Sequence, residues 1–319
     1  MTPVLHLLVP GLLGPAPRGA AALPRLPNVE RVLARGERRD GPASYVAALF
    51  ELFGQPVSVD EDMPSAALCH ARETGKAADD WVLHADPVHL RPDQDRLLLF
   101  DAGILDLEAE EAAALADCFN GHFAADGLRI EAPTPGRWYL RCAEPPGVCT
   151  TTLDEVTGRN LDPYLPTGPR ARFWRGVLNE TQMLFHDHPV NAARISAGRE
   201  PVSGIWLSGG GRMPPRGSTR IAHLTGDDLL AEALAAQADP VSSAGDELIV
   251  EQALWRAMLA ADAAAWMAAL VEFDRRLDTW LDTDRPCRLS VCDGRAVHWE
   301  RSMRRRFWRR VRPYVDCLG

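Results

Sequence analysis

The sequence has one lysine, Lys76, and no apolar run of the length that a membrane span requires. A single lysine leaves almost no position for a Schiff base or for the lysine of a P-loop. A transmembrane helix needs about 20 consecutive apolar residues. The first residues also lack the basic segment that opens a secretory signal. The sequence therefore predicts a cytoplasmic protein that does not enter a membrane.

Basic residues are fewer than acidic ones, 35 against 44, which gives a net charge of −9. A chain of this charge lacks a general basic surface, so nucleic acid is not an expected partner. The seven cysteines are odd in number and irregularly spaced, which favours buried thiols over a disulfide framework. The apolar content of 46% is that of globular proteins, and the length of 319 residues predicts about two domains.

Strand and helix patterns alternate near both ends of the chain. The apolar run of residues 4–9 stops at Pro10 and Gly11, which is typical of a buried strand. Further strands are predicted at residues 204–208, 220–224 and 287–292. Helical spacing is found at residues 28–36, 43–53, 170–186, 247–259 and 262–281. This alternation indicates an α/β domain with a parallel sheet.

The middle of the chain has a different pattern. Strands are predicted at residues 81–84, 97–101 and 138–142, with a helix at 107–123. A proline-containing break at residues 56–64 precedes this series. We therefore expect an α/β core made of residues 1–62 and 146–319 that carries a smaller inserted α+β domain, residues 63–145.

Two groups of residues have the side chains that bind metals. His186 and His188 form one pair, and His84, Asp86 and His89 form a second group. In a second interpretation, all five side chains belong to helix ends and loops and form hydrogen bonds to the backbone. The spacing alone does not fix a third ligand, so both interpretations stay open.

Two further segments offer anion-binding chemistry. Gly209, Gly210 and Gly211 follow a predicted strand and would let backbone amides approach a phosphate, although a tight turn explains them equally well. The C-terminal segment RSMRRRFWRRVRP places Met303 and Phe307 on one predicted helical stripe among arginines. These arginines could bind phosphate or an acidic protein partner. The alternative is a docked helix whose arginines pair with the chain's own carboxylates.

One long segment resembles a known family. Residues His186–Gly211, HDHPVNAARISAGREPVSGIWLSGGG, are similar to the archaeal-type cofactor-independent phosphoglycerate mutases, which have HPVN, an arginine, a glycine, a proline and a strand ending in glycines. LPRLPNVERVLARG resembles the early helix of that family, and LLLFDAGILDLEAEEAAALADCFNGHF its inserted domain. With its HADPVHL segment the chain is most similar to the RpfE-type regulatory proteins of bacteria. The resemblance implies an alkaline-phosphatase-like α/β/α sandwich core.

The resemblance also implies a chemistry that this sequence departs from. Those mutases use a serine or threonine nucleophile and two divalent metals. Here the first strand ends in VPGLLG in place of an acidic metal motif, and PAPRGAAA before the early helix holds no serine or threonine. The late metal motifs are missing as well, with only Asp293 and His298 nearby at a different spacing.

We therefore expect a mutase-like protein that is catalytically silent, holds no metal or other cofactor and has a regulatory or ligand-binding role. The retained motif predicts a remnant anion site for a small phosphorylated ligand, formed by His188, Asn191, Arg194 and Arg199. The alternative is an active phosphoglycerate mutase or related phosphotransferase with a rearranged Mn or Zn site. Its candidate ligands are Asp86, His89, Asp154, Asp162 and His298.

Overall fold

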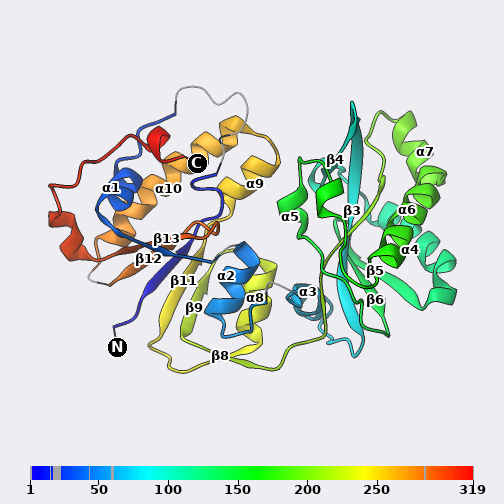
Figure 1. Ribbon diagram of the computed structural model, residues 1–319, viewed down its shortest axis with the longest axis horizontal. Helices are drawn as coiled ribbons and strands as arrows, with labels where there is room; N and C mark the ends of the chain where they lie inside the picture. Colours follow the sequence, from blue (N-terminus) through cyan, green and yellow to red (C-terminus); the bar gives the residue numbers. More distant parts are fainter. Residues whose placement is uncertain are drawn as a thin grey trace. The chain divides into compact units, whose positions relative to one another are not determined.

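The chain divides into two compact units, each with its own core. The computed structural model describes residues 2–14, 16, 23–42, 44–58, 61–283 and 285–318. The core unit comprises Met1–Val57 and Arg216–Gly319, and the inserted unit comprises Ser58–Pro215 (Figure 1). The α/β core with an inserted α+β unit agrees with the fold class predicted from the sequence. No helix in the described ranges is long and apolar enough to cross a bilayer.

The core unit alternates strands and helices. Its strands are β1 (Leu5–Leu8), β2 (Glu37–Asp40), β8 (Gly217–Thr219), β9 (Ile221–Thr225), β10 (Ala238–Pro240), β11 (Asp246–Val250), β12 (Cys287–Ser290) and β13 (Arg295–Trp299). Its helices are α1 (Pro27–Arg35), α2 (Tyr45–Leu52), α8 (Leu229–Ala236), α9 (Ala253–Leu259) and α10 (Ala263–Leu281). Two short 3-10 helices, η4 (Arg301–Arg305) and η5 (Tyr314–Cys317), follow the last strand.

Six strands form the central sheet of the core unit in the order β2-β13-β12-β1-β11-β9. Strands β12, β1, β11 and β9 are parallel, and β13 and β2 continue the sheet in antiparallel pairing. Figure 1 shows α1, α9 and α10 on one face of the sheet and α2 and α8 on the other. This is a three-layer α/β/α sandwich, and ligands of such folds bind beyond the carboxyl ends of the parallel strands.

One stripe of α10 fills the core on its side of the sheet. Trp266, Leu270, Phe273, Leu277 and Leu281 recur at steps of three or four residues and are all buried. This is the stripe that the periodicity predicts.

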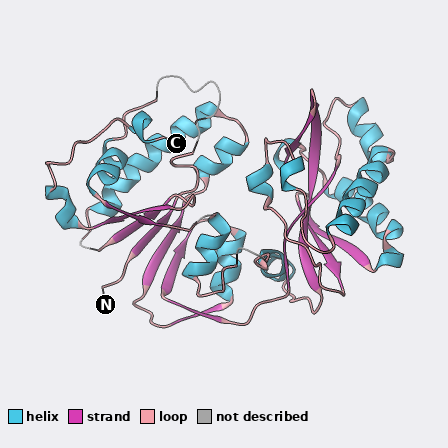
Figure 2. Ribbon diagram, in the orientation of Figure 1, coloured by secondary structure: helices cyan, strands magenta, loops and turns pink. Residues whose placement is uncertain are grey.

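The inserted unit is built around an antiparallel sheet (Figure 2). Its strands are β3 (Trp81–Asp93), β4 (Arg96–Phe100), β5 (Leu128–Thr134), β6 (Arg137–Cys142) and β7 (Gly204–Gly211). Its helices are α3 (Ser65–Thr74), α4 (Ala109–His122), α5 (Leu153–Val156), α6 (Ala171–His186) and α7 (Pro189–Ser196). The 3-10 helices are η1 (Ala102–Ile104), η2 (Ala124–Asp126) and η3 (Asp162–Tyr164).

The inserted unit extends further along the chain than the range 63–145 predicted from the sequence. The added part contains α6, α7 and β7, and β7 pairs with β3 over residues 82–88 of that long strand. Buried side chains of α6, such as Trp174 and Phe185, lie in the same core cluster as Leu83 on β3 and Trp138 on β6. Residues 146–215 therefore belong by their packing to the inserted unit.

Two predicted helices differ from the structure. Residues 246–250 form β11, a central strand of the core sheet, so the helix predicted over 247–259 is wrong in its first part. The sequence LIV is fully buried there, and a short apolar run has no periodicity that separates a strand from a helix. The C-terminal segment forms only η4 and η5, and Phe307 is 81% exposed, so the predicted helical stripe is wrong too.

Candidate functional site

The HPVN motif lies at the junction of α6, α7 and β7, where its polar groups bond to the backbone. The Nδ1 atom of His188 caps α7 by accepting from the Val190 amide at 3.2 Å. The side-chain amide of Asn191 donates to the carbonyls of Phe185 and Val202 at 2.7 and 2.8 Å. Its oxygen accepts from the amide of Val202 at 2.8 Å. Asn191 thus fixes the chain that leads from α7 into β7.

Arg194 is a fully buried clamp in the inserted unit, with an exposed fraction of 0%. Its Nε donates to the carbonyl of Glu200 at 2.8 Å, its Nη1 donates to the Glu111 carboxylate at 2.6 Å, and its Nη2 donates to the carbonyl of Leu105. Arg199 donates to the other oxygen of Glu111 at 2.5 Å. The two arginines thus meet on one carboxylate of α4.

The four residues of the predicted anion site thus lie on α7, its N-cap and the segment that follows it, and each has protein groups as its partners. A guanidinium without exposed surface reaches no ligand unless the unit rearranges. A pocket of about 700 Å³ lies beside the motif and is lined by His186, Asp187 and Asn191 among others, but its lining contains no arginine or lysine. This pocket lacks the fixed cation that a phosphate would need. The ligand-binding role of the motif stays a prediction from the sequence.

The second histidine group lies on β3. His84 is buried, and burial lowers its pKa to about 4. Burial also raises the pKa of Asp86 to about 7, and this carboxyl accepts from the Trp138 amide at 3.1 Å. His89 is bonded through Nδ1 to the carbonyl of Pro201 at 3.0 Å. His84 and Asp86 are therefore both neutral at mildly acidic pH. The Nε2 atom of His89 lies 3.3 Å from the Glu200 carboxylate.

The glycine run continues β7 and does not form a phosphate turn. The amide of Gly210 donates to the Asp62 carboxylate at 3.0 Å, and the amide of Gly209 donates to Thr150 Oγ1 at 3.2 Å. Gly209 has a φ of +61°, and a Cβ at this position would lie 2.0 Å from Ser65 Oγ. The glycines are needed for close approach of β7 to α3, and protein acceptors already use these amides.

The carboxyl edge of the core sheet is where a three-layer sandwich of this kind binds its ligands. Asp227 follows β9 and pairs with Arg256 at 3.0 Å. Glu251 follows β11 and pairs with Arg276 at 2.7 Å, and burial raises the pKa of Glu251. Each of these carboxylates thus has an arginine as its ion-pair partner.

A third carboxylate of this edge, Asp228, is used locally. One of its oxygens caps α8 by accepting from the Ala231 amide at 2.7 Å. The other accepts from the side-chain amide of Gln252 at 2.5 Å. Burial raises the pKa of Asp228, and the neighbouring Tyr45 hydroxyl has a raised pKa for the same reason.

The described residues do not fit a two-metal centre. They contain no group of three or more His, Cys, Asp or Glu side chains with the geometry of a metal site. Among the candidate ligands of a rearranged site, His298 belongs to the core unit and lies 3.2 Å from Glu300, and Asp86, His89, Asp154 and Asp162 belong to the inserted unit. Asp293 is paired with Arg295. All seven cysteines are described and none forms a disulfide.

Comparisons with known proteins define the relationship more closely. No family model matches the chain. The chain is 24% identical over 200 residues to a 2,3-bisphosphoglycerate-independent phosphoglycerate mutase of Methanosarcina acetivorans. The match covers 60% of this chain and 49% of that protein. A probable enzyme of the same name from Geobacter sulfurreducens is 25% identical over 210 residues, covering 63% and 52%. The chain thus matches about half the length of these relatives.

A cofactor-independent phosphoglycerate mutase of Thermoplasma acidophilum is similar in structure, with 14% identity, a TM-score of 0.43 and coverage of 94% of this chain and 90% of that one. The sequence matches support the predicted phosphoglycerate mutase-like relationship. They give no support to the finer assignment to the RpfE-type regulatory proteins.

Proposed function

We propose that this protein is a phosphoglycerate mutase-like protein that does not transfer phosphoryl groups and acts as a regulatory or ligand-binding protein. The observation that carries the proposal is the state of the carboxylates at the edge of the core sheet. Asp227 and Glu251 are each held by an arginine, and Asp228 is held by a helix amide and Gln252.

Phosphoryl transfer through a metal pair needs open carboxylate and imidazole ligands that the protein holds in place. At this edge the carboxylates of Asp227 and Glu251 already have Arg256 and Arg276 as ion-pair partners. The sequence adds that VPGLLG replaces the acidic motif after the first strand. The regulatory role itself, a cytoplasmic location and the RpfE-type assignment are predictions from the sequence.

A coupled assay for the interconversion of 3- and 2-phosphoglycerate tests this proposal. The full chain is stripped of metal and assayed alone and after addition of Mn²⁺, Zn²⁺ or Mg²⁺, with an active cofactor-independent mutase as the positive control. We expect no turnover above the rate without protein under any of these conditions. Turnover that depends on Mn²⁺ or Zn²⁺ would contradict the proposal and favour a rearranged metal site.

A further inference from the structure

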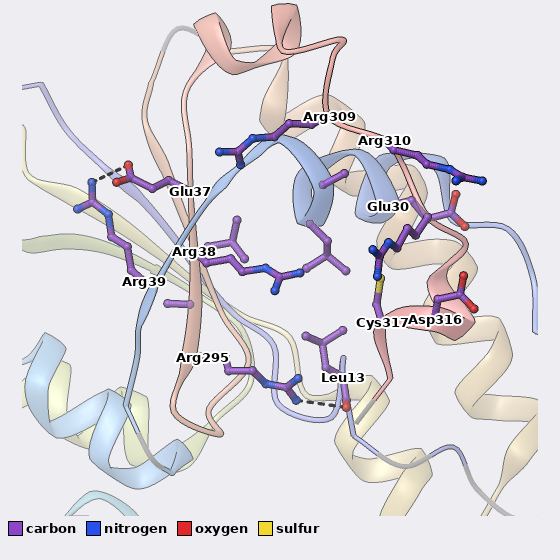
Figure 3. A pocket seen from close by; sticks show the side chains of 15 residues that line it. Leu13, Glu30, Glu37, Arg38, Arg39, Arg295, Arg309, Arg310, Asp316 and Cys317 are labelled. Atoms are coloured by element: carbon purple, nitrogen blue, oxygen red, sulfur yellow. Dashed lines mark hydrogen bonds and ion pairs between the residues drawn. The ribbon is translucent and has the colours of Figure 1, made fainter.

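An open pocket of about 800 Å³ lies on the core unit, between α1, β2, β13 and the segment that follows β13 (Figure 3). Its lining includes six arginines, Arg38, Arg39, Arg295, Arg309, Arg310 and Arg312, and three carboxylates, Glu30, Glu37 and Asp316. We call it the arginine pocket. Acidic residues outnumber basic ones in the whole chain, so the arginine pocket is a local reversal of the general charge.

Two of the three carboxylates are already neutralised. Glu37 pairs with Arg39 at 3.1 Å. Glu30 pairs at 2.6 Å with Arg25, which is not part of the lining, and its oxygen also accepts from the amide of Tyr314. The hydrogen bonds from Arg25 lower the pKa of Glu30, so this group is an ionised but fully paired anion at neutral pH.

The arginines fall into two groups. Arg295 is held by Asp293 at 2.8 Å, and Arg309 donates to the carbonyl of Gly36 at 2.8 Å. Arg38, Arg310 and Arg312 have no hydrogen-bond or ion-pair partner among the described residues. In Figure 3 the guanidinium of Arg38 points into the middle of the pocket. A bound anion would neutralise unpaired arginines of this kind.

The rest of the lining is apolar. Leu33 and Ala34 of α1 face the pocket together with Ala296 and Val297 of β13. Cys317 adds no charge at neutral pH, because burial raises the pKa of its thiol. A ligand that fits both features has an apolar or planar body and several negative charges.

We propose that the arginine pocket binds a small organic polyanion, a compact apolar or planar molecule with two or more phosphate or carboxylate charges. The volume is that of small-molecule sites, which measure about 300–1,000 Å³. The arginines come from β2, β13 and the C-terminal segment and line one concavity, whereas a nucleic-acid surface presents its cations along an extended strip. Guanidinium groups bind such ligands through paired, charge-assisted hydrogen bonds. The core unit alone forms the pocket, so the inference is independent of whether the protein transfers phosphoryl groups.

Isothermal titration calorimetry of the full chain tests the inference, with inorganic pyrophosphate as the bare anion and ADP as an organic diphosphate. We expect saturable binding of about one molecule per chain at low salt, weakening as salt rises. ADP should bind several-fold more tightly than pyrophosphate because of the apolar lining. The double variant Arg38→Ala/Arg312→Ala should lose about 10-fold or more in affinity for both probes, which corresponds to one charge-assisted hydrogen bond or more.

Arg305→Ala is the matched control, because Arg305 is exposed on the same C-terminal segment but does not line the arginine pocket. The substituted arginines have no partners to lose, so thermal unfolding of all variants should match that of the wild type. Absence of binding in the wild type would overturn the inference. An equal loss of affinity in Arg305→Ala would also overturn it, because that result indicates a general basic surface. The same holds if a single-stranded oligonucleotide binds more tightly than the two probes and its binding depends equally on Arg305. Equal affinities for ADP and pyrophosphate would overturn the organic part of the ligand assignment.

Discussion

His84 and Asp86 lie two residues apart on β3, and burial keeps both of them neutral. In the unfolded chain Asp86 ionises near pH 3.8, but in the native state its pKa is about 7. The native state thus binds more protons, and the contribution of Asp86 to stability falls as pH rises from about 4 to 7. His84 has its native pKa at about 4 and its unfolded value at 6.5, so its contribution rises with pH over that range. The two contributions oppose each other.

Single variants should separate these two contributions. Between pH 4.5 and 6.5, the slope of the unfolding free energy against pH should be more positive for Asp86→Asn than for the wild type, by up to about 1.4 kcal/mol per pH unit. His84→Gln should show a negative relative slope of similar size. Urea denaturation at several pH values measures both, and each variant serves as the control for the other. Slopes that shift in the same direction, or that do not shift, would contradict the assignment of two opposed buried groups.

Some residues of the candidate site can be predicted from the sequence, and others cannot. The HPVN motif, Arg194 and Arg199 could be selected because their order along the chain is distinctive. Their partners could not, because Glu111 lies 83 residues from Arg194 and meets it only in the fold. The C-terminal arginines of the arginine pocket could be selected from the sequence, but the residues that complete its lining could not. Arg38 and Arg39 form an ordinary charged pair in the sequence, and β2 brings them beside the C-terminal arginines only when it pairs with β13.

At the scale of elements, the Arg194 clamp joins three segments of the inserted unit. It ties α4, through Glu111, to the carbonyl of Leu105 and to the carbonyl of Glu200 before β7. Arg194→Met keeps much of the volume but leaves the buried carbonyl of Leu105 and the partly buried carbonyl of Glu200 without this donor. We expect a loss of about 3–5 kcal/mol in the unfolding free energy, as for other broken buried ion pairs.

The comparison variant for the clamp is Arg199→Met, because the Arg199 side chain is 33% exposed and its pairing with Glu111 is partly screened. Its loss of stability, measured by the same denaturation, should be clearly smaller. Neither variant should change the affinity of the arginine pocket for pyrophosphate, since that pocket belongs to the other unit. Unchanged stability of Arg194→Met with weaker phosphate binding would place Arg194 in a ligand site.

Element prediction succeeded where the pattern was long and amphipathic. The stripe of α10 could be found because its apolar residues are separated by polar ones. The strand β11 could not be distinguished from a helix, since a strand buried on both faces has no alternation. The C-terminal segment fails as a helix for a different reason. Its arginines dock on the ends of other elements, as when Arg304 and Arg306 donate to the carbonyls of Leu281 and Arg35.

At the scale of the whole molecule, the division into units depends on contacts that are remote in the sequence. A boundary after residue 145 follows from the turn-rich stretch that begins there, and the helix and strand beyond it have the same local pattern as those of the core. The pairing of β7 with β3 and the packing of α6 in the same core assign them to the inserted unit. Local patterns predict which elements form, whereas the partner of a strand is decided by long-range contacts.

This division predicts which part of the chain folds alone. A fragment of residues 58–215 retains β7, α6 and α7, and we expect it to unfold cooperatively on heating, with the near-ultraviolet circular dichroism of buried tryptophans such as Trp138 and Trp174. A fragment of residues 63–145 loses the strand that pairs with β3 and exposes Leu83, Ala85 and Trp138, so it should lack both signals. Cooperative unfolding of the shorter fragment would show that β7 and α6 are accessory to this core. Failure of the longer fragment to fold, when the full chain unfolds cooperatively, would show that the inserted unit depends on the core unit for its stability.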